Sequence, residues 1–326
     1  MARIIRGTNG ADRINQNGRS AITIQALGGN DTIVLDRDDD LGGDNTVDAG
    51  KGNDTVVNSF EGGNQIALGK GNDIYVGTGF SFLNAIDIVD GGAGNDQFFV
   101  STLLSTYIGG NGNDIFRSNG HKNDFVGGNG SDTISYEFRH EDSVVGDEGV
   151  TVDLNAQAAL TGSNSREDFS SIENAIGSLN NDLVIGSNGA NTLMGLAGSD
   201  ELQGKSGNDV MVGGLGQDFL FGEGDADTFV FQKTADSSTV ASARDIIFDF
   251  SRSAGDRIDL SGIDADTTLR GNQAFEFIGA AAFTGEAGEA RFSNGVLSVD
   301  VNGNGTADMT VDVRGLTTML AADFIL

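Results

Sequence analysis

The chain contains no cysteine, no proline and no tryptophan. Without cysteine it can form no disulfide and no thiolate metal site, so an extracellular protein of this kind needs another staple. Proline is absent although there are 50 glycines, whereas disordered linkers tend to carry both residues. This combination indicates ordered turns that need positive φ angles, together with backbone N–H groups that stay available for hydrogen bonds.

Two further absences concern membranes and targeting. No run of eighteen apolar residues occurs, so no membrane-spanning helix and no membrane insertion are expected. The first residues, MARIIRGTNGADRINQ, lack the apolar core of a Sec-type signal peptide. These two absences alone fit a cytosolic protein, and the features that favour export lie elsewhere in the chain.

Basic residues are scarce. The sequence has 19 Lys and Arg against 48 Asp and Glu, which gives a formal net charge of −29. Nucleic acids and anionic membranes are recognised through basic patches, so neither is an expected partner. Carboxylates at this density attract cations, and they oppose compaction while they stay unpaired. The hydrophobic content of 38% is nevertheless too high for a fully disordered chain.

A repeat of nine residues dominates the second half of the chain. It follows the frame G-G-x-G-x-D-x-U-x, in which U is a large apolar residue. The best copies are GKSGNDVMV (Gly204 to Val212) and GGLGQDFLF (Gly213 to Phe221). The acidic position is filled by Asp182, Asn191, Asp200, Asp209, Asp218 and Asp227, and the U position by Val184, Leu193, Leu202, Met211, Leu220 and Phe229.

This spacing predicts an all-β fold, a parallel β-roll or β-solenoid. Six residues form a turn in which glycines supply left-handed backbone angles, and three form a short strand whose U side chain points inward. One nonapeptide is half a coil, so aspartates eighteen residues apart, such as Asp182 and Asp200, lie above one another. Stacked carboxylates repel each other unless a cation lies between them, and oxygen ligands suit a hard ion such as Ca²⁺. We therefore expect multiple Ca²⁺ ions.

The N-terminal half carries a variant in which the aspartates are whole coils apart. Their steps are 19, 23, 19, 23, 18 and 18 residues, and typical turns read AGKGNDTVV and GGNGNDIFR. We expect one calcium column along one edge, with small loops near DRDDD (Asp36 to Asp40) and TGFSF (Thr78 to Phe82) in the two longer coils. The aspartates of this column are Asp12, Asp31, Asp54, Asp73, Asp96, Asp114 and Asp132.

The opposite edge of this half is mostly amide or hydroxyl. Its residues precede five of the column aspartates by nine positions: Asn45, Asn64, Asp87, Ser105 and Asn123. We expect this edge to bind calcium weakly or not at all, because it carries a single carboxylate. Stacked asparagine side chains can instead form hydrogen bonds along the stack.

The repeat divides the chain into four predicted segments. Residues 1–135 form an N-terminal solenoid, and residues 182–227 form the nonapeptide roll. Residues 136–181 interrupt the repeat, with a strand in GVTVDL (Gly149 to Leu154). In residues 228–326 the glycines thin out and polar and apolar residues alternate, as in RDIIFDF and ARFSNGVLSVDV. This last segment is predicted to be an antiparallel β domain that caps the open end of the roll.

The nonapeptides resemble those of RTX, or repeats-in-toxin, proteins, in about a dozen copies over roughly two thirds of the chain. The middle, from GVTVDL to SIENAIGSLNND, resembles the connector between RTX blocks. The last hundred residues, with DADTFVF, RDIIFDF and GDRIDLSGID, resemble the serralysin-type C-terminal domain. The ending from Asp323 to Leu326 resembles the acidic-then-hydrophobic signal of substrates of type I ABC exporters.

This resemblance implies β-roll folding, calcium ligation by the consensus aspartates, and export by a type I ABC exporter to the extracellular space or the cell surface. Asn191 departs from the motif, and Asp182 lies in the glycine-poor turn GSLNND. In a calcium-poor cytosol the carboxylates stay unpaired, so we expect a loose or unfolded chain that suits passage through a narrow exporter.

Motifs of the enzymes that carry such arrays are missing. There is no H-E-x-x-H zinc motif and no G-x-S-x-G elbow, and the two histidines, His121 and His140, lie in a degenerate turn and in the charged interruption. The loop DVNGNGTAD (Asp300 to Asp308) begins like an EF-hand but lacks the acidic twelfth residue, so a polar turn and a calcium site both stay open. Carboxylates are too numerous for the sequence to single out a catalytic pair.

Two functions fit these features. The first is a secreted calcium-binding structural or surface protein that folds outside the cell and self-associates into a matrix, surface layer or filament. The second is an extracellular polysaccharide-active enzyme of the lyase or epimerase type, or its polysaccharide-binding accessory module. A cleft lined by Lys51, Lys70 or Arg117 is the expected place for a polysaccharide. Whether the chain is an enzyme stays undecided, and the missing motifs argue against it.

Overall fold

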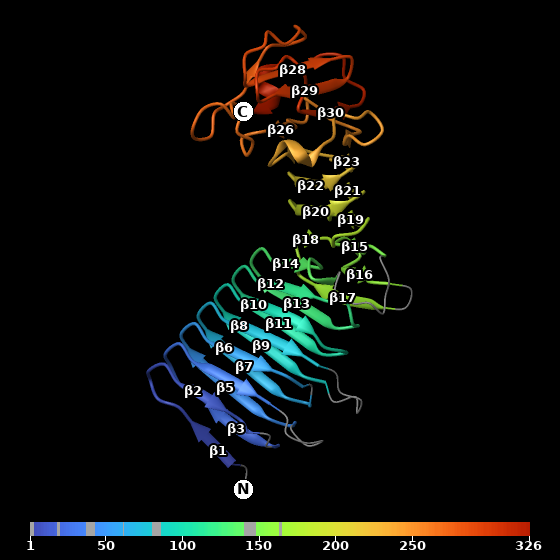
Figure 1. The fold of residues 1–326 in the computed structure, drawn as a ribbon. Coiled ribbons are helices and arrows are strands. Elements are labelled where there is room, and N and C mark those ends of the chain that lie inside the picture. The colour runs from blue at the N-terminus through green and yellow to red at the C-terminus, as the bar shows by residue number, and fades with distance from the viewer. Residues whose placement is uncertain are drawn as a thin grey trace. The chain divides into compact units, whose positions relative to one another are not determined.

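The computed structural model describes residues 3–17, 20–36, 43–60, 62–79, 86–139, 148–162 and 165–326. It is an all-β molecule in which successive coils stack their strands in parallel, which confirms the predicted β-solenoid (Figure 1). The chain divides into two units. The first comprises Met1–Gly146 and Ala156–Asn174, and the second comprises Asp147–Asn155 and Ala175–Leu326. The sequence that interrupts the repeat therefore contributes to both units.

Each coil of the first unit contributes one strand to each of two parallel sheets (Figure 1). The first sheet consists of β1 (Arg3–Arg6), β3 (Ile22–Gln25), β5 (Thr46–Lys51), β7 (Gln65–Lys70), β9 (Ile88–Ala93), β11 (Thr106–Asn111), β13 (Asp124–Asn129) and β17 (Arg166–Ser170), with β16 (Ala158–Leu160) antiparallel to β17. The second consists of β2 (Arg13–Asn15), β4 (Thr32–Leu35), β6 (Thr55–Asn58), β8 (Ile74–Thr78), β10 (Gln97–Ser101), β12 (Ile115–Ser118) and β14 (Thr133–Ser135).

The register of these sheets does not depend on coil length. Val57 pairs with Val34, 23 residues earlier, and with Val76, 19 residues later. The additional residues of the longer coils lie between strands, outside the hydrogen-bonded ladder. The inward-facing residues of successive coils therefore remain directly above one another. The two loops predicted for these coils lie largely outside the described residues.

The core of the first unit is a stack of inward side chains, and most strands contribute two inward positions to it. Phe98 of β10 pairs in register with Tyr75 and Phe116, and all three are fully buried. The rings of Phe98 and Phe116 stack with their centroids 4.7 Å apart, and Tyr107 and Phe125 stack in the same way from the other sheet. Alternation of buried and less buried positions along each strand produces these stacks of equivalent side chains.

The second unit continues the same design with shorter strands. One sheet holds β15 (Thr151–Asp153), β19 (Leu183–Ile185), β21 (Glu201–Gln203), β23 (Phe219–Phe221), β25 (Ile246–Ile247), β30 (Met309–Val313), β29 (Val296–Asp300), β28 (Glu289–Ser293) and β27 (Glu276–Phe277). The other holds β18 (Asn174–Ile176), β20 (Thr192–Gly198), β22 (Val210–Gly216), β24 (Thr228–Val230), β26 (Arg257–Asp259) and β31 (Phe324–Ile325). All six U residues predicted from the sequence are buried.

The end of the second unit changes from parallel coils to a meander. Strands β28, β29 and β30 pair antiparallel, which confirms the expected antiparallel structure. Strand β30 also extends the roll by pairing in parallel with β25. The helices of the described residues are short 3₁₀ turns, η2 (Thr234–Asp236) and η3 (Ala321–Asp323), so none of them is long and apolar enough to cross a membrane.

Replacement of Phe98 by alanine tests the importance of the aromatic file. Removing a fully buried ring leaves a cavity between Tyr75 and Phe116, and we expect a loss of about 3–5 kcal/mol in the free energy of unfolding measured in calcium. Leu160→Ala is the control, because Leu160 is 51% exposed, and it should change stability by less than about 0.5 kcal/mol. Equal effects of the two substitutions in urea titrations would contradict this core.

Candidate calcium-binding turns

The aspartates of the first unit lie in file along one edge and are joined by hydrogen bonds. The backbone N–H of each aspartate donates to Oδ1 of the aspartate one coil further along. The N–H of Asp12 donates to Asp31 (2.8 Å), and that of Asp31 donates to Asp54 (2.7 Å). The same bond recurs for every later member, through Asp54, Asp73, Asp96, Asp114 and Asp132. One oxygen of each carboxylate is thereby fixed by the ladder.

The second unit carries two such columns, one on each edge. In the first, the N–H of Asp182 donates to Asp200 and that of Asp200 to Asp218. In the second, the N–H of Asn191 donates to Asp209 and that of Asp209 to Asp227. All twelve aspartates predicted as ligands therefore lie in one of three columns. Their role as ligands stays a prediction.

The other carboxylate oxygen has no partner in most turns. Among the described residues, Oδ2 is buried without a hydrogen bond in eleven aspartates: Asp31, Asp54, Asp73, Asp96, Asp114, Asp132, Asp200, Asp209, Asp218, Asp227 and Asp245. Leaving a buried acceptor unsatisfied costs about 1–3 kcal/mol, and more for a charged group. So many orphaned oxygens in regular file indicate a missing partner that every turn binds in the same way.

Oxygens from two coils converge around the first glycine of a turn. A Cβ placed on Gly109 would lie 2.2 Å from Oδ2 of Asp114 and 2.7 Å from the carbonyl oxygen of Gly127 in the next coil. In the second unit, a Cβ on Gly204 would lie 2.4 Å from Oδ2 of Asp209 and 2.9 Å from the carbonyl oxygen of Gly222. A side chain at this position would fill the space that the carboxylate and carbonyl oxygens share.

Ten turns share a backbone conformation, and we call them open turns. Each consists of six residues and ends in one of the ten repeat aspartates, from Asp31 to Asp227, whose Oδ2 lacks a partner among the described residues. The second and fourth residues of each open turn have positive φ. In the turn 109–114 these residues are Gly110 and Gly112, whereas in the turn 195–200 the second residue is Leu196 with a φ of 80°. A non-glycine residue in this region costs about 1–3 kcal/mol and persists only where its surroundings enforce it.

Three turns differ, and we call them closed turns: 7–12, 177–182 and 186–191. Their second and fourth residues do not have positive φ, and the final side chain is bonded within its own turn. Two of them contain Asp12 and Asp182, which the sequence motif predicts as ligands, although Asp182 lies in a glycine-poor turn. Asp182 accepts hydrogen bonds on both carboxylate oxygens, from Val150 and Ser178.

The columns continue beyond the repeat. In the first unit, the N–H of Asp132 donates to Oε2 of Glu173 (2.9 Å). In the second unit, the N–H groups of Asp218 and Asp227 donate to Asp245 and Asp256 (both 3.0 Å). The repeat pattern does not reveal these three acceptors, because they follow their neighbours by 41, 27 and 29 residues, which breaks the period. Asp245 also has a buried Oδ2 without a partner in the described residues, like the repeat aspartates.

The opposite edge of the first unit is a ladder of amides and hydroxyls. The side chain of Asn45 donates to Oδ1 of Asn64 (2.8 Å), which confirms the expected pairing of stacked asparagines. Asp87 accepts hydrogen bonds from the backbone of Asn64 (2.7 Å) and from the side chain of Asn58 (2.6 Å). Both of its oxygens are therefore satisfied without an ion. Glu167 closes this edge and accepts hydrogen bonds from Ser118 and Tyr136.

The donors of the open turns fit a hard cation that tolerates irregular oxygen shells. Each open turn offers an orphaned carboxylate oxygen, and in turns such as 109–114 and 204–209 a backbone carbonyl lies nearby, which is a ligand set suited to Ca²⁺. Within the described part of the chain, no three His, Cys, Asp or Glu side chains gather closely enough to bind a metal ion alone. An ion in these turns would thus need backbone oxygens as well as carboxylates.

Burial shifts the protonation of the column aspartates. It raises the pKa of Asp96 to about 7, against the effect of the hydrogen bond from Asp73, and neighbouring carboxylates raise it further. Burial likewise raises the pKa of Asp200 to about 8, and that of Asp54 to about 6. Asp245 is shifted most, to about 9, by burial and by the charge of Asp218. Each of these carboxylates is costly to ionise in the folded chain without a cation.

Within the described part of the chain, the other motifs singled out in the sequence do not form a second site. His121 donates its backbone N–H to Glu167, and His140 lies outside the described residues. In the loop DVNGNGTAD, the Asp300 carboxylate accepts backbone hydrogen bonds from Gly303 and Gly305, and Asp308 accepts one from Val301. The loop is therefore filled by its own backbone, as expected of a polar turn.

Two family models match the chain, and they cover different parts of it. The family model described as Peptidase M10 serralysin C terminal matches residues 128–326. The family model described as RTX calcium-binding nonapeptide repeat (4 copies) matches residues 23–41, 39–56, 84–100 and 106–134. No curated protein matches the chain.

Two solved structures are similar to parts of the chain. A subunit of the mannuronan C5-epimerase of Azotobacter vinelandii is 28% identical, with a TM-score of 0.29, over 41% of this chain and 71% of that one. An extracellular lipase of Serratia marcescens is 19% identical, with a TM-score of 0.31, over 78% of this chain and 40% of that one. The chain thus spans less than half the length of the lipase.

The raised pKa values predict how stability depends on pH without calcium. A carboxyl whose pKa is higher in the folded state stabilises the fold fully below its unfolded pKa, near 4, and this contribution is lost as pH rises through the folded value. In EDTA we therefore expect the folded fraction, measured by circular dichroism, to fall steadily between pH 5 and pH 8, where the column aspartates titrate. The whole of this range lies above the isoelectric point of the chain, about 4.1. A folded fraction in EDTA that rises over this range would contradict the assignment.

Proposed function

Because the chain belongs to the serralysin C-terminal family, whose model covers residues 128–326, we propose that Ca²⁺ bound in the ten open turns folds it after export. Its nonapeptide repeats make it a secreted calcium-binding RTX protein, and RTX proteins are substrates of type I secretion. The observation that carries the proposal is the file of buried Oδ2 atoms without a partner in the described residues.

Electrostatics links these oxygens to the place of folding. Without a divalent ion, each coil buries another carboxylate away from water and near like charges, and the raised pKa values express that penalty, of which burial is the larger part. In a calcium-poor cytosol this opposes folding and favours a chain that can be threaded through an exporter. Outside the cell, calcium removes the repulsion and supplies the partner that each Oδ2 lacks.

The free energy available from calcium is large enough to decide the state of the chain. Extracellular calcium modules bind with Kd values of about 10⁻⁴ to 10⁻³ M. At a tenfold excess over Kd, one site contributes about 1.4 kcal/mol, and ten such sites contribute about 14 kcal/mol. The whole stability of a domain is about 5–15 kcal/mol. Calcium alone can therefore move the chain between unfolded and folded states.

For the folded protein we propose a structural or surface role outside the cell, with self-association into a matrix, surface layer or filament. Among the described residues, the solenoid and its terminal β domain account for the whole architecture. Light scattering in millimolar calcium should then show a mass that grows with protein concentration. A constant monomer mass would count against self-association and would leave calcium-driven folding intact.

Asp114→Asn tests the calcium role of a single column member. Asparagine keeps an oxygen for the N–H of Asp96, but it replaces the charged Oδ2 by an amide. In millimolar calcium we expect a loss of at least about 1.4 kcal/mol in the free energy of unfolding, because one calcium site is lost. Asp48→Asn removes the same charge from an exposed position on β5 and should have little effect. Circular dichroism that is identical in EDTA and in calcium for the unchanged chain would refute calcium-driven folding.

Carbohydrate binding is a second candidate, favoured by one cavity of the first unit. It has a volume of about 260 Å³ and is lined by Phe99, Phe138, Arg117, Asn119 and Ser101, among others. The Arg117 guanidinium lies 5.0 Å above the Phe99 ring and pairs with Glu137 at 2.6 Å. Of the three basic residues expected to line a cleft, Arg117 is the one that this cavity contains. Aromatic rings beside hydrogen-bonding groups suit the faces and hydroxyls of a sugar unit.

Phe138→Ala tests the carbohydrate role. Phe138 is 42% exposed, so its removal should not unfold the chain, but it should weaken retention in affinity electrophoresis by at least about fivefold if a polysaccharide stacks on this ring. Leu160→Ala is the control, because Leu160 is also an exposed apolar residue of the same unit, at 51%. Unchanged mobility of both variants across a panel of neutral and acidic polysaccharides would reject this candidate.

A further inference from the structure

We propose that the second residue of each six-residue turn decides whether that turn takes an ion. In the closed turns, Thr8, Ser178 and Ser187 supply hydrogen bonds where the open turns need calcium. This inference builds on the proposed function, since it assumes that the open turns bind Ca²⁺. It divides the predicted ligands into two classes that the sequence motif alone does not separate.

The closed turn at Asp12 shows the substitution clearly. Oδ2 of Asp12 accepts hydrogen bonds from the backbone N–H of Thr8 (2.5 Å) and from its hydroxyl (3.0 Å). In the turn before Asp182, the N–H of Ser178 donates to Oδ2 (2.5 Å) and its hydroxyl donates to Oδ1 (2.8 Å). The oxygen that is orphaned in every open turn thus has two donors from one residue in the first case, and a direct backbone donor in the second.

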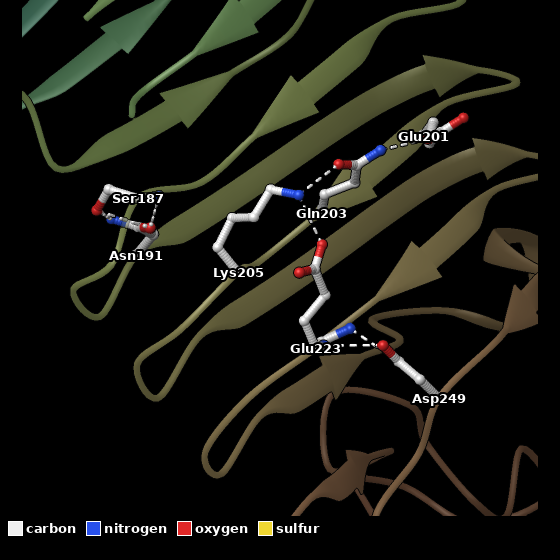
Figure 2. A network of polar contacts seen from close by, with 8 residues as sticks. Ser187, Asn191, Glu201, Gln203, Lys205, Glu223 and Asp249 are labelled. Carbon is white, nitrogen blue, oxygen red and sulfur yellow. Dashed lines mark hydrogen bonds and ion pairs between the residues drawn. The ribbon is translucent and has the colours of Figure 1, made fainter. Parts of the chain in front are cut away.

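The third closed turn, 186–191, has an uncharged residue in place of the aspartate. Asn191 takes the place of the aspartate, and its Oδ1 accepts from the N–H of Ser187 (2.6 Å), as Figure 2 shows. The side-chain amide of Asn191 bonds to the Ser187 hydroxyl in return (3.1 Å). A neutral amide held by an adjacent hydroxyl leaves no anionic oxygen for a cation.

The next turn on the same edge shows that a polar second residue is not enough. Lys205 occupies the second position there with a φ of 80°, and its Nζ reaches away to Gln203 (2.9 Å) and Glu223 (2.7 Å), as seen in Figure 2. Oδ2 of Asp209, the last residue of that turn, stays without a partner among the described residues. A short hydroxyl and a backbone without positive φ are therefore the features that close a turn.

The closed turns also have equivalent positions in their columns. Asp12, Asp182 and Asn191 are each the first repeat position of their column, and the hydrogen bonds of the ladder run from them toward the later coils. An ion shared between coils would have a repeat turn on one side only at these positions. A turn closed by its own hydroxyl ends the column without leaving a carboxylate unpaired.

Exchange of the second residue tests the inference by counting ions. In the full chain, Ser187→Gly together with Asn191→Asp recreates the consensus of an open turn, and we expect equilibrium dialysis in calcium to show one more bound ion than in the unchanged chain. Asn191→Asp alone should add none, because Ser187 still closes the turn on the new carboxylate. In the opposite direction, Lys205→Ser should remove one ion, whereas Lys205→Ala should remove none.

Three outcomes would overturn the inference: no gained ion in a folded double variant, a gained ion with Asn191→Asp alone, or an unchanged count with Lys205→Ser. Circular dichroism in calcium establishes that each variant is folded, so a lost ion is not confused with a lost fold. If the unchanged chain binds no calcium at all, the proposed function itself fails, and this result is distinct from the other three. The ion count is a readout that does not depend on any activity of the protein.

Discussion

Every coil of this molecule faces the same constraint: a buried carboxylate lies directly above another. One oxygen of each aspartate is satisfied by the backbone N–H of the preceding coil, which fixes the rise and register of the solenoid. The second oxygen is buried by that same stacking and, among the described residues, is left without a partner in eleven cases. The geometry that holds the coils together thus creates the charge that an ion has to neutralise.

Buried polar groups at the turns are satisfied in three different ways in this molecule. The open turns present carboxylate and carbonyl oxygens to a cation, and without one their raised pKa values favour protonation. The opposite edge of the first unit replaces most carboxylates by asparagine and serine, and its one aspartate, Asp87, is fully hydrogen-bonded. The three closed turns use a neighbouring hydroxyl and backbone N–H. A single stacked architecture therefore combines edges that depend on cations with edges that do not.

The period of the sequence was sufficient to predict the solenoid, the inward U residues and the columns of aspartates. The asparagine ladder also followed from the sequence, because stacked amides satisfy each other wherever the coils are in register. The acceptors Glu173, Asp245 and Asp256 could not be found in this way, since the chain leaves the period before each of them. The sequence marks two of the closed turns, at Asp182 and Asn191, as departures from the motif, but it does not distinguish the turn at Asp12. The aspartate position alone does not reveal φ at the second residue, although a serine or threonine there is visible in the sequence and is the signal to look for.

The dependence of the unfolding equilibrium on calcium concentration tests the central claim most directly. The slope of the logarithm of the folding constant against the logarithm of free calcium counts the ions taken up on folding, once the sites are near saturation. If the orphaned oxygens of the open turns bind calcium, this slope approaches ten, the number of open turns in the described chain. A slope near zero, with a chain that stays folded in EDTA at neutral pH, would show that the columns are stable without cations and would contradict the account.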